Sequence, residues 1–210
     1  MSTPLAKKQD LYTWEDYRSW PATERWQIVG GEAYAMSAAP ATRHQLLVGR
    51  LTRDWSNFLQ GKPCDVYPAP TDLKLSDMDI VQPDLLVVCE PEKVKATHIE
   101  GPPTVVIEIL SPSTEWLDRG RKLDLYAASG VQEVWLITPY PSLFEIFTLD
   151  GRSYRRVHAF TQEEPFHSPA FPDLALNLTA LFDFPTTPEE RINVVRESHP
   201  AYAGKRTAAR

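Results

Sequence analysis

Two carboxylates, Asp84 and Glu108, each lie within an apolar run of the sequence. The runs are 83–88 and 105–110, and their Val, Ile and Leu content predicts two strands buried on both faces. A carboxylate among apolar neighbours needs a cation, a proton or several hydrogen-bond donors, because burying a bare charge is costly. Antiparallel pairing across the 91–103 loop would bring the start of one strand to the end of the other, and the carboxylates together. Two hard oxygen ligands at a strand end predict a magnesium-type site.

Lys122 is the candidate cation for this site, with Arg121 as the second choice. In the acid-x-Lys arrangement of many metal nucleases, a lysine beside the acid helps to orient or activate the attacking water, but Leu110 occupies that position here. A cation from the following helix could supply the charge stabilisation instead. The alternative, which spacing alone favours, is a solvent-exposed ion pair between Lys122 and Asp118 one helical turn earlier.

Three further polar residues are weaker candidates. Glu32 follows a tight turn and could be a third acidic metal ligand, although a solvated turn carboxylate explains it as well. His44 lies in the first turn of a predicted helix, on the apolar face, where a structural role is commoner than a catalytic or substrate-binding one. Gln82 precedes the aspartate and could donate to water or phosphate, or make a strand-edge hydrogen bond. Ser111 and Ser113 fit turn and cap positions, because no Ser-His-Asp pattern surrounds them.

The elements that must position these residues follow from hydrophobic periodicity and turn residues. In chain order they are a helix over about 41–60, a strand region over 66–75 that Pro68 and Pro70 interrupt, strands over 83–88 and 105–110, a helix ending at Gly130, and a strand over 134–138. Gly120 weakens the second helix, so its regular part should begin near Leu117 or later. The strands on either side of that helix should be parallel, with a right-handed crossover. The predicted fold class is therefore α/β, with a mixed sheet flanked by helices.

Hairpins and extensions surround this core. Gly30-Gly31 and Asp150-Gly151 each lie between strand-like runs and predict an N-terminal and a C-terminal hairpin. Thr13 can cap a short helix over 14–20. We expect one domain over 1–185 and a polar C-terminal extension over 186–210, in which 186–197 could form a peripheral helix.

Composition narrows the class of protein. The 210 residues carry a formal net charge of −6, which disfavours a non-specific nucleic-acid binder but does not exclude local basic patches. The two cysteines, Cys64 and Cys89, suit a reducing cytoplasm and predict neither a disulfide framework nor a zinc site. No signal peptide and no membrane-spanning run is visible, so we expect a cytoplasmic protein.

The sequence resembles the Uma-two family, restriction-endonuclease-like proteins of the PD-(D/E)XK nuclease superfamily, most specifically over 107–135. The matching residues are Pro83-Asp84, Glu108-Ile109-Leu110-Ser111-Pro112-Ser113, Asp118, Lys122, Tyr126, Gly130-Val131 and Glu133-Val134-Trp135. The resemblance runs from about Trp14 to Phe182 and includes Gly31-Glu32 and His44. It implies an αβββαβ core with Asp84 and Glu108 as metal ligands. It also implies that Lys122 takes the role of the lysine that Leu110 replaces.

These observations together predict a Mg²⁺-dependent endonuclease that hydrolyses nucleic acid, with DNA as the expected substrate and Mn²⁺ as a possible substitute. Asp84 and Glu108 would bind the metal, and Lys122 would assist the water nucleophile or the transition state. The alternative is a non-cleaving nucleic-acid-binding or assembly protein that keeps the fold, which the acidic charge and the missing acid-x-Lys lysine support. A homodimer is expected, because closed twofold assembly is the commonest oligomer.

Overall fold

The computed structural model describes residues 11–21, 23–36 and 40–185. Within these ranges the helical segments are α1 (Trp14–Ser19), α2 (Thr42–Leu59), the 3-10 turn η1 (Pro91–Lys93), α3 (Glu115–Leu117), the π-helical turn η2 (Asp118–Lys122), α4 (Leu123–Ser129) and α5 (Leu178–Leu181). Thr13 caps α1 as predicted, since its side chain accepts from the Asp16 N–H. The helix predicted for 186–197 lies outside the described residues.

A six-stranded mixed sheet forms the centre of the fold, with strand order β11-β10-β9-β8-β6-β3. Its strands are β3 (Asp65–Pro68), β6 (Leu85–Val88), β8 (Val105–Ile109), β9 (Glu133–Thr138), β10 (Leu143–Asp150) and β11 (Ser153–Phe160). β6 and β8 are antiparallel, β8 and β9 are parallel, and β10 and β11 form a hairpin. These pairings confirm the predicted β-α-β unit and C-terminal hairpin, and α2, β3, β6, β8, α4 and β9 make up the expected αβββαβ core.

A second mixed sheet of five short strands is present in addition to the predicted one, with order β2-β1-β5-β4-β7. Its strands are β1 (Trp26–Val29), β2 (Glu32–Ala35), β4 (Leu73–Ser76), β5 (Asp79–Val81) and β7 (Ile99–Glu100). The predicted strand 66–75 is in fact two strands in different sheets, β3 and β4. Pro68 ends the first strand and Pro70 follows shortly after it; neither proline has an N–H to donate, so the ladder does not continue. The predicted N-terminal hairpin is part of this second sheet.

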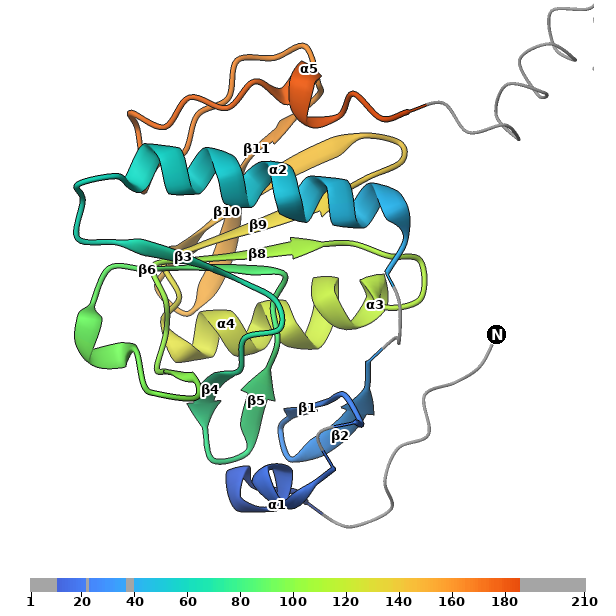
Figure 1. The fold of residues 1–210 in the computed structure, drawn as a ribbon, viewed down its shortest axis with the longest axis vertical. Coiled ribbons are helices and arrows are strands. Elements are labelled where there is room, and N and C mark those ends of the chain that lie inside the picture. Colours follow the sequence, from blue (N-terminus) through green and yellow to red (C-terminus); the bar gives the residue numbers. More distant parts are fainter. Residues whose placement is uncertain (1–10, 22, 37–39, 186–210) are drawn as a thin grey trace, which may run out of the picture.

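The six-stranded sheet is covered on both faces (Figure 1). On one face, Leu47, Leu51 and Trp55 of α2 are completely buried and pack in one cluster with Ile107 and Trp135 of the sheet. They recur at the i, i+4 and i+8 spacing that creates an apolar helix face, so the packing of this face holds α2 over the central strands.

The opposite face of the sheet carries α4 and the second sheet. Tyr126 of α4 packs with Val106 of β8 and with Leu73 and Val81 of the five-stranded sheet. The two sheets therefore share a hydrophobic cluster. The chain passes from β5 of one sheet to β6 of the other through residues 82–84, which include the predicted metal ligand Asp84.

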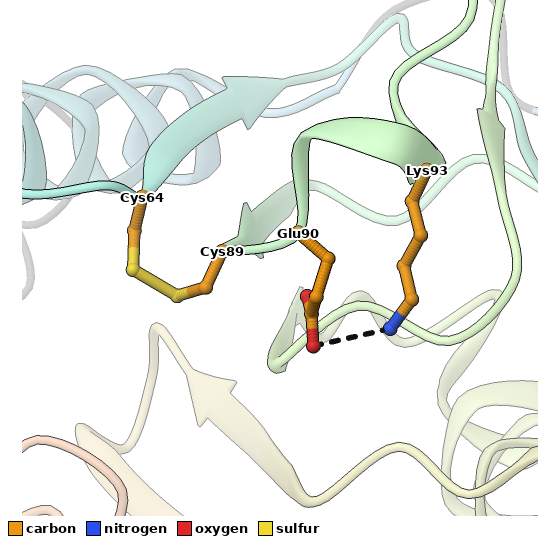
Figure 2. Close-up of a disulfide and its surroundings, with 4 residues drawn as sticks. All are labelled: Cys64, Cys89, Glu90 and Lys93. Carbon is orange, nitrogen blue, oxygen red and sulfur yellow. Dashed lines mark ion pairs between the residues drawn. A yellow bond between two sulfur atoms is a disulfide. The ribbon is translucent and has the colours of Figure 1, made fainter.

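A disulfide joins Cys64 and Cys89 and corrects the prediction that the cysteines form no disulfide (Figure 2). The residues are 25 positions apart in sequence. Asp65 pairs with Val88 in the β3–β6 ladder, so the next residues outward on the two strands are the cysteines themselves. Sequence spacing does not reveal this pairing because the strand register creates it.

No helix among the described residues is both long enough and apolar enough to span a membrane.

Candidate active site

Asp84 and Glu108 face each other across two antiparallel strands. Leu85 pairs with Ile107, and continuing this register outward by one residue places Asp84 opposite Glu108. Residues directly opposite on neighbouring strands point to the same face of a sheet. The predicted antiparallel pairing is thus confirmed, and it brings the two carboxylates to one edge of the sheet.

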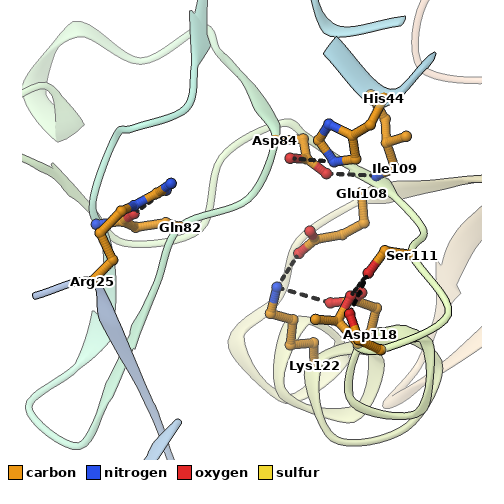
Figure 3. A network of polar contacts seen from close by, with 11 residues as sticks. Arg25, His44, Gln82, Asp84, Glu108, Ile109, Ser111, Asp118 and Lys122 are labelled. Carbon is orange, nitrogen blue, oxygen red and sulfur yellow. Dashed lines mark hydrogen bonds and ion pairs between the residues drawn. The ribbon is translucent and has the colours of Figure 1, made fainter. Parts of the chain in front are cut away.

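Asp84 is held by two donors from different elements (Figure 3). The backbone N–H of Ile109 donates to Oδ2 at 2.7 Å, and Nε2 of His44 lies 3.1 Å from Oδ1. His44 comes from the first turn of α2, so the helix that covers the sheet also reaches the carboxylate. The structure places this histidine on the candidate metal ligand rather than in the apolar core.

Glu108 lies in the protein interior with 3% of its surface exposed. Its Oε1 accepts from the Lys122 ammonium at 3.0 Å and from the Tyr126 hydroxyl at 2.5 Å. Both donors lie on the helical segment that follows β8 through a short turn. The segment predicted to bring a cation back to the strand end therefore does so.

Lys122 is buried between two carboxylates. Its ammonium lies 2.9 Å from Oδ1 of Asp118 and 3.0 Å from Oε1 of Glu108, and the Thr114 hydroxyl donates to Oδ2 of Asp118 at 3.0 Å. Lys122 and Asp118 are respectively 3% and 4% exposed. The alternative of a solvent-exposed Lys122–Asp118 pair is wrong, because this pair is buried and includes Glu108.

The local helix geometry creates this arrangement. Residues 115–129 do not form one regular α-helix, because the π-helical turn η2 separates α3 from α4 and contains Gly120. Asp118 and Lys122 begin and end this turn, and both side chains face inward. π-Turns inserted in α-helices are frequent at functional sites, since they move side chains out of the regular helical positions.

Burial and charge determine the protonation of the pair. Burial, together with the nearby carboxylates of Asp118 and Asp84, raises the pKa of Glu108 to about 8, although the Lys122 ammonium opposes the shift. Burial lowers the pKa of Lys122, but its ion pairs with Glu108 and Asp118 outweigh burial and leave that pKa above its usual value. The lysine is therefore charged, and once Glu108 is ionised the site holds more carboxylates than strong cations. That excess of negative charge favours binding of a further cation.

The pKa of His44 is also shifted. Burial lowers it, but the hydrogen bond and charge of Asp84 outweigh burial, so the pKa is raised above 6.5. Nδ1 of the ring is buried without a hydrogen-bond partner among the described residues. A protonated His44 places a positive charge beside the Asp84 carboxyl.

A cavity of about 810 Å³ opens onto these residues. Its lining includes Asp84, Glu108, Lys122 and His44, and also Gln82, whose side chain accepts from Nη2 of Arg25 at 2.8 Å. In Figure 3 the Arg25–Gln82 pair lies apart from the carboxylates, on the side of the five-stranded sheet. The predicted substrate-binding residues His44 and Gln82 thus lie in the same cavity as the predicted catalytic residues.

Glu32 is separated from this cavity. It is 56% exposed and forms an ion pair with Arg121 at 2.5 Å, and Tyr34 donates to it at 2.7 Å. Arg121 is adjacent to Lys122 in sequence but points outward, so the two cations lie on different sides of the helical segment. The structure does not bring Glu32 to the predicted metal ligands, and Arg121 is not the cation at the site.

The donor set fits a magnesium ion that is completed by water and substrate. Among the described residues, no three His, Cys, Asp or Glu side chains are arranged to hold a metal ion. Mg²⁺ is commonly bound by one or two carboxylates together with waters and substrate phosphate, so a set of two is sufficient. Asp84 and Glu108 would be those two ligands. Burial and the nearby carboxylates raise the pKa of Glu108, and a bound divalent cation would oppose that shift.

Sequence reasoning missed the roles of three residues at this site. Arg25 immediately precedes β1 and donates to Gln82, Tyr126 donates to Glu108, and Asp118 holds Lys122 in the interior. For two of them a signal was present, because Lys122 and Tyr126 are four apart and Asp118 and Lys122 are four apart. Side chains at this spacing share a helix face. No sequence signal connects Arg25 with Gln82.

Known proteins share the sequence pattern and the fold of this chain. Residues 14–179 match the model of the Uma2 family, described as "Putative restriction endonuclease". "Uncharacterized protein slr1290" of Synechocystis is 32% identical over 134 residues, which cover 61% of this chain and 69% of that protein. A crystal structure of "a putative nuclease belonging to DUF820" from Anabaena variabilis shares the fold, with a TM-score of 0.68 at 18% identity, over 81% of this chain and 97% of that one. The chain belongs to the Uma2 family of restriction-endonuclease-like proteins.

Proposed function

We propose that this protein is a Mg²⁺-dependent endonuclease that hydrolyses phosphodiester bonds, with DNA as its substrate. The observation that carries the proposal is the contact between Lys122 and Glu108, at the point where Glu108 faces Asp84. A cation beside two facing carboxylates is the set of groups that metal-assisted phosphodiester hydrolysis requires. The family match supports a nuclease, and this contact suggests how the chain compensates for Leu110.

A bound Mg²⁺ would polarise a phosphoryl oxygen and lower the pKa of a water molecule. Asp84 and Glu108 would hold the ion, with the Ile109 N–H and the Tyr126 hydroxyl fixing the orientation of their carboxylates. Fixed carboxylate orientations are important because a small displacement of the metal or the nucleophile lowers the rate of hydrolysis strongly.

Lys122 would place its positive charge beside the reacting phosphate. Its ammonium is a compact charge on a flexible stem, and the ion pairs with Asp118 and Glu108 together hold it in place. In this position it would donate to the attacking oxygen or to the phosphoryl oxygens as their charge increases in the transition state. Arg25, held by Gln82 across the cavity, would bind a phosphate of the substrate strand.

A cleavage assay tests the proposal. Plasmid and linear DNA are incubated with the full chain and Mg²⁺ or Mn²⁺, with EDTA as the metal-free control and Asp84→Asn as the matched inactive variant. We expect nicking or cutting by the wild-type protein with metal, and none in the two controls. Binding of DNA without cleavage under all conditions would instead support the non-cleaving alternative.

A further inference from the structure

A second cavity of about 490 Å³ adjoins the candidate active site. The two cavities share three lining residues, Arg25, Pro70 and Gln82. A ligand that extends past the Arg25–Gln82 pair would therefore reach from one cavity into the other. Nothing in the mechanism proposed above uses the second cavity.

One side of the second cavity is aromatic. Trp14 and Tyr17 lie one turn apart on α1, with their rings stacked at a centroid distance of 5.7 Å and an angle of 16°. Trp20 follows α1 and meets Tyr17 edge-on at 5.7 Å. All three side chains are half-buried and line the cavity, and the Trp14 ring also contacts His98 at a centroid distance of 4.7 Å, with the Lys74 ammonium 5.9 Å from its centroid. Flat aromatic surfaces of this kind bind planar ligands by stacking.

The charges around the cavity favour a neutral ligand over a phosphate. Its lining includes two arginines, Arg18 and Arg25, and two carboxylates, Glu24 and Asp72, so the positive charge is matched. A phosphate site would need an excess of cations or of N–H donors. A nucleobase, which is planar, uncharged and rich in hydrogen-bonding groups, matches this lining better.

The polar wall of the cavity is fixed by its own hydrogen bonds. Oδ1 of Asp72 accepts from the Tyr17 hydroxyl at 2.7 Å and from Nε2 of Gln82 at 2.8 Å. Arg25 then donates to Gln82, which connects this wall to the first cavity. A preorganised wall costs little reordering when a ligand binds.

We propose that this second cavity binds one unpaired nucleobase of the substrate strand, next to the phosphate held in the first cavity. The inference rests on the proposed function. Base stacking on aromatic side chains is tolerant of sequence, so the cavity would select an unpaired base rather than a particular one. A base inside a duplex must leave its stack to enter, so single strands and frayed ends bind better than fully paired DNA.

The test uses short single-stranded oligonucleotides that carry 2-aminopurine at successive positions, mixed with the full chain and Ca²⁺ in place of Mg²⁺. Fluorescence of this base falls when it stacks. We expect quenching at one position by the wild-type protein, and tighter binding of the single strand than of its duplex. Trp14→Leu should abolish the quenching and weaken binding about tenfold, whereas Trp14→Phe, which keeps a ring, should retain both.

Trp116→Leu is the matched control, because Trp116 is 56% exposed and lines neither cavity. Thermal unfolding of each variant checks that α1 remains folded. If the wild-type protein cleaves DNA but quenches no position, or prefers the fully paired duplex, the inference is wrong while the proposed function stands. If the protein neither binds nor cleaves nucleic acid, both are wrong.

Discussion

The Lys122 ammonium lies 3.0 Å from Oε1 of Glu108, although one residue belongs to a strand and the other to a π-helical turn 14 positions later. Both side chains are 4% exposed. A buried ion pair of this kind requires each partner, because removal of one leaves the other charge without compensation. The stability of the fold and the proposed catalysis therefore both depend on the contact between Lys122 and Glu108.

The metal ligands can be tested without any nucleic acid. Asp84→Asn and Glu108→Gln each remove one anionic oxygen ligand, so we expect each to weaken Mn²⁺ binding at least tenfold in isothermal titration calorimetry. Glu32→Gln is the matched control, because that carboxylate is exposed and paired with Arg121, and its affinity for Mn²⁺ should be unchanged. Equal Mn²⁺ affinities in all three variants would contradict the assignment.

Metal affinity should depend on pH through Glu108. Because its pKa is raised to about 8, the carboxyl is protonated below that pH in the metal-free protein and must lose this proton to bind metal. Apparent Mn²⁺ affinity should therefore rise by up to tenfold per pH unit between about pH 6 and pH 8 and then level off. Calorimetry in buffers of different ionisation enthalpy measures the proton release directly. A Mn²⁺ affinity that does not change with pH would show that Glu108 does not release a proton on metal binding.

The same shift has a defined effect on metal-free stability. A pKa raised from 4.5 means that the folded state binds the Glu108 proton more tightly than the unfolded state does. This contribution to the free energy of unfolding is complete below about pH 4.5 and is lost as the pH rises through about 8. Urea unfolding of the wild-type protein and of Glu108→Gln across this pH range measures the contribution, since the free energy of unfolding of the variant should lack this pH dependence.

Lys122→Ala should separate catalysis from metal binding. Both carboxylate ligands remain, so Mn²⁺ binding should persist, whereas cleavage should fall below detection. The free energy of unfolding should decrease by about 3 kcal/mol, because Glu108 and Asp118 remain buried without their cation. Lys122→Arg should restore little activity, since the planar guanidinium is larger than the ammonium. Full cleavage by Lys122→Ala would rule out the role assigned to this lysine.

The disulfide should stabilise the fold without affecting the site. Cys64 and Cys89 close a loop of 25 residues, and cross-linking a loop of this size contributes about 3 kcal/mol to the free energy of unfolding. The double variant Cys64→Ser, Cys89→Ser should therefore unfold at lower urea concentration and yet bind Mn²⁺ like the wild-type protein. Dithiothreitol should destabilise the wild-type protein but leave the double variant unchanged.

The predicted homodimer is a matter for solution measurement. Light scattering should give about twice the chain mass of 23.8 kDa at micromolar concentration. Trp116 and Tyr140 are large exposed side chains, 56% and 78% accessible, that a second copy could cover. A mass equal to one chain across the concentration range would show a monomer.

The part of the site that sequence predicted depends on local patterns. Two apolar runs, each with one carboxylate, were sufficient to predict that Asp84 and Glu108 meet, because antiparallel pairing leaves few registers that bury both strands. Gly130 likewise ended its helix as predicted, in the left-handed conformation at φ 87°. These features are decided within a strand pair or a helix end.

What sequence did not predict depends on contacts between distant segments. Residues 66–75 read as one strand, yet β4 leaves the central sheet to pair with β5 and β7. The Cys64–Cys89 pairing follows from strand register, and the ion pair of Glu32 with Arg121 joins segments 89 residues apart. Spacing also could not show whether the Lys122–Asp118 pair is exposed to water. Helical periodicity places the two side chains on the same face of the helix but does not show whether that face is buried.

The π-helical turn at Asp118–Lys122 determines how the side chains of α3 are rotated about the helix axis relative to those of α4. Each residue of an α-helix advances the side-chain direction by about 100°, so loss of a single residue such as Gly120 would rotate everything on the N-terminal side by that angle. Tyr126 and Lys122 would keep their places on Glu108, because they lie at or after the end of the turn. Asp118 would turn away from the ammonium, and Lys122 would lose one of its two carboxylate partners.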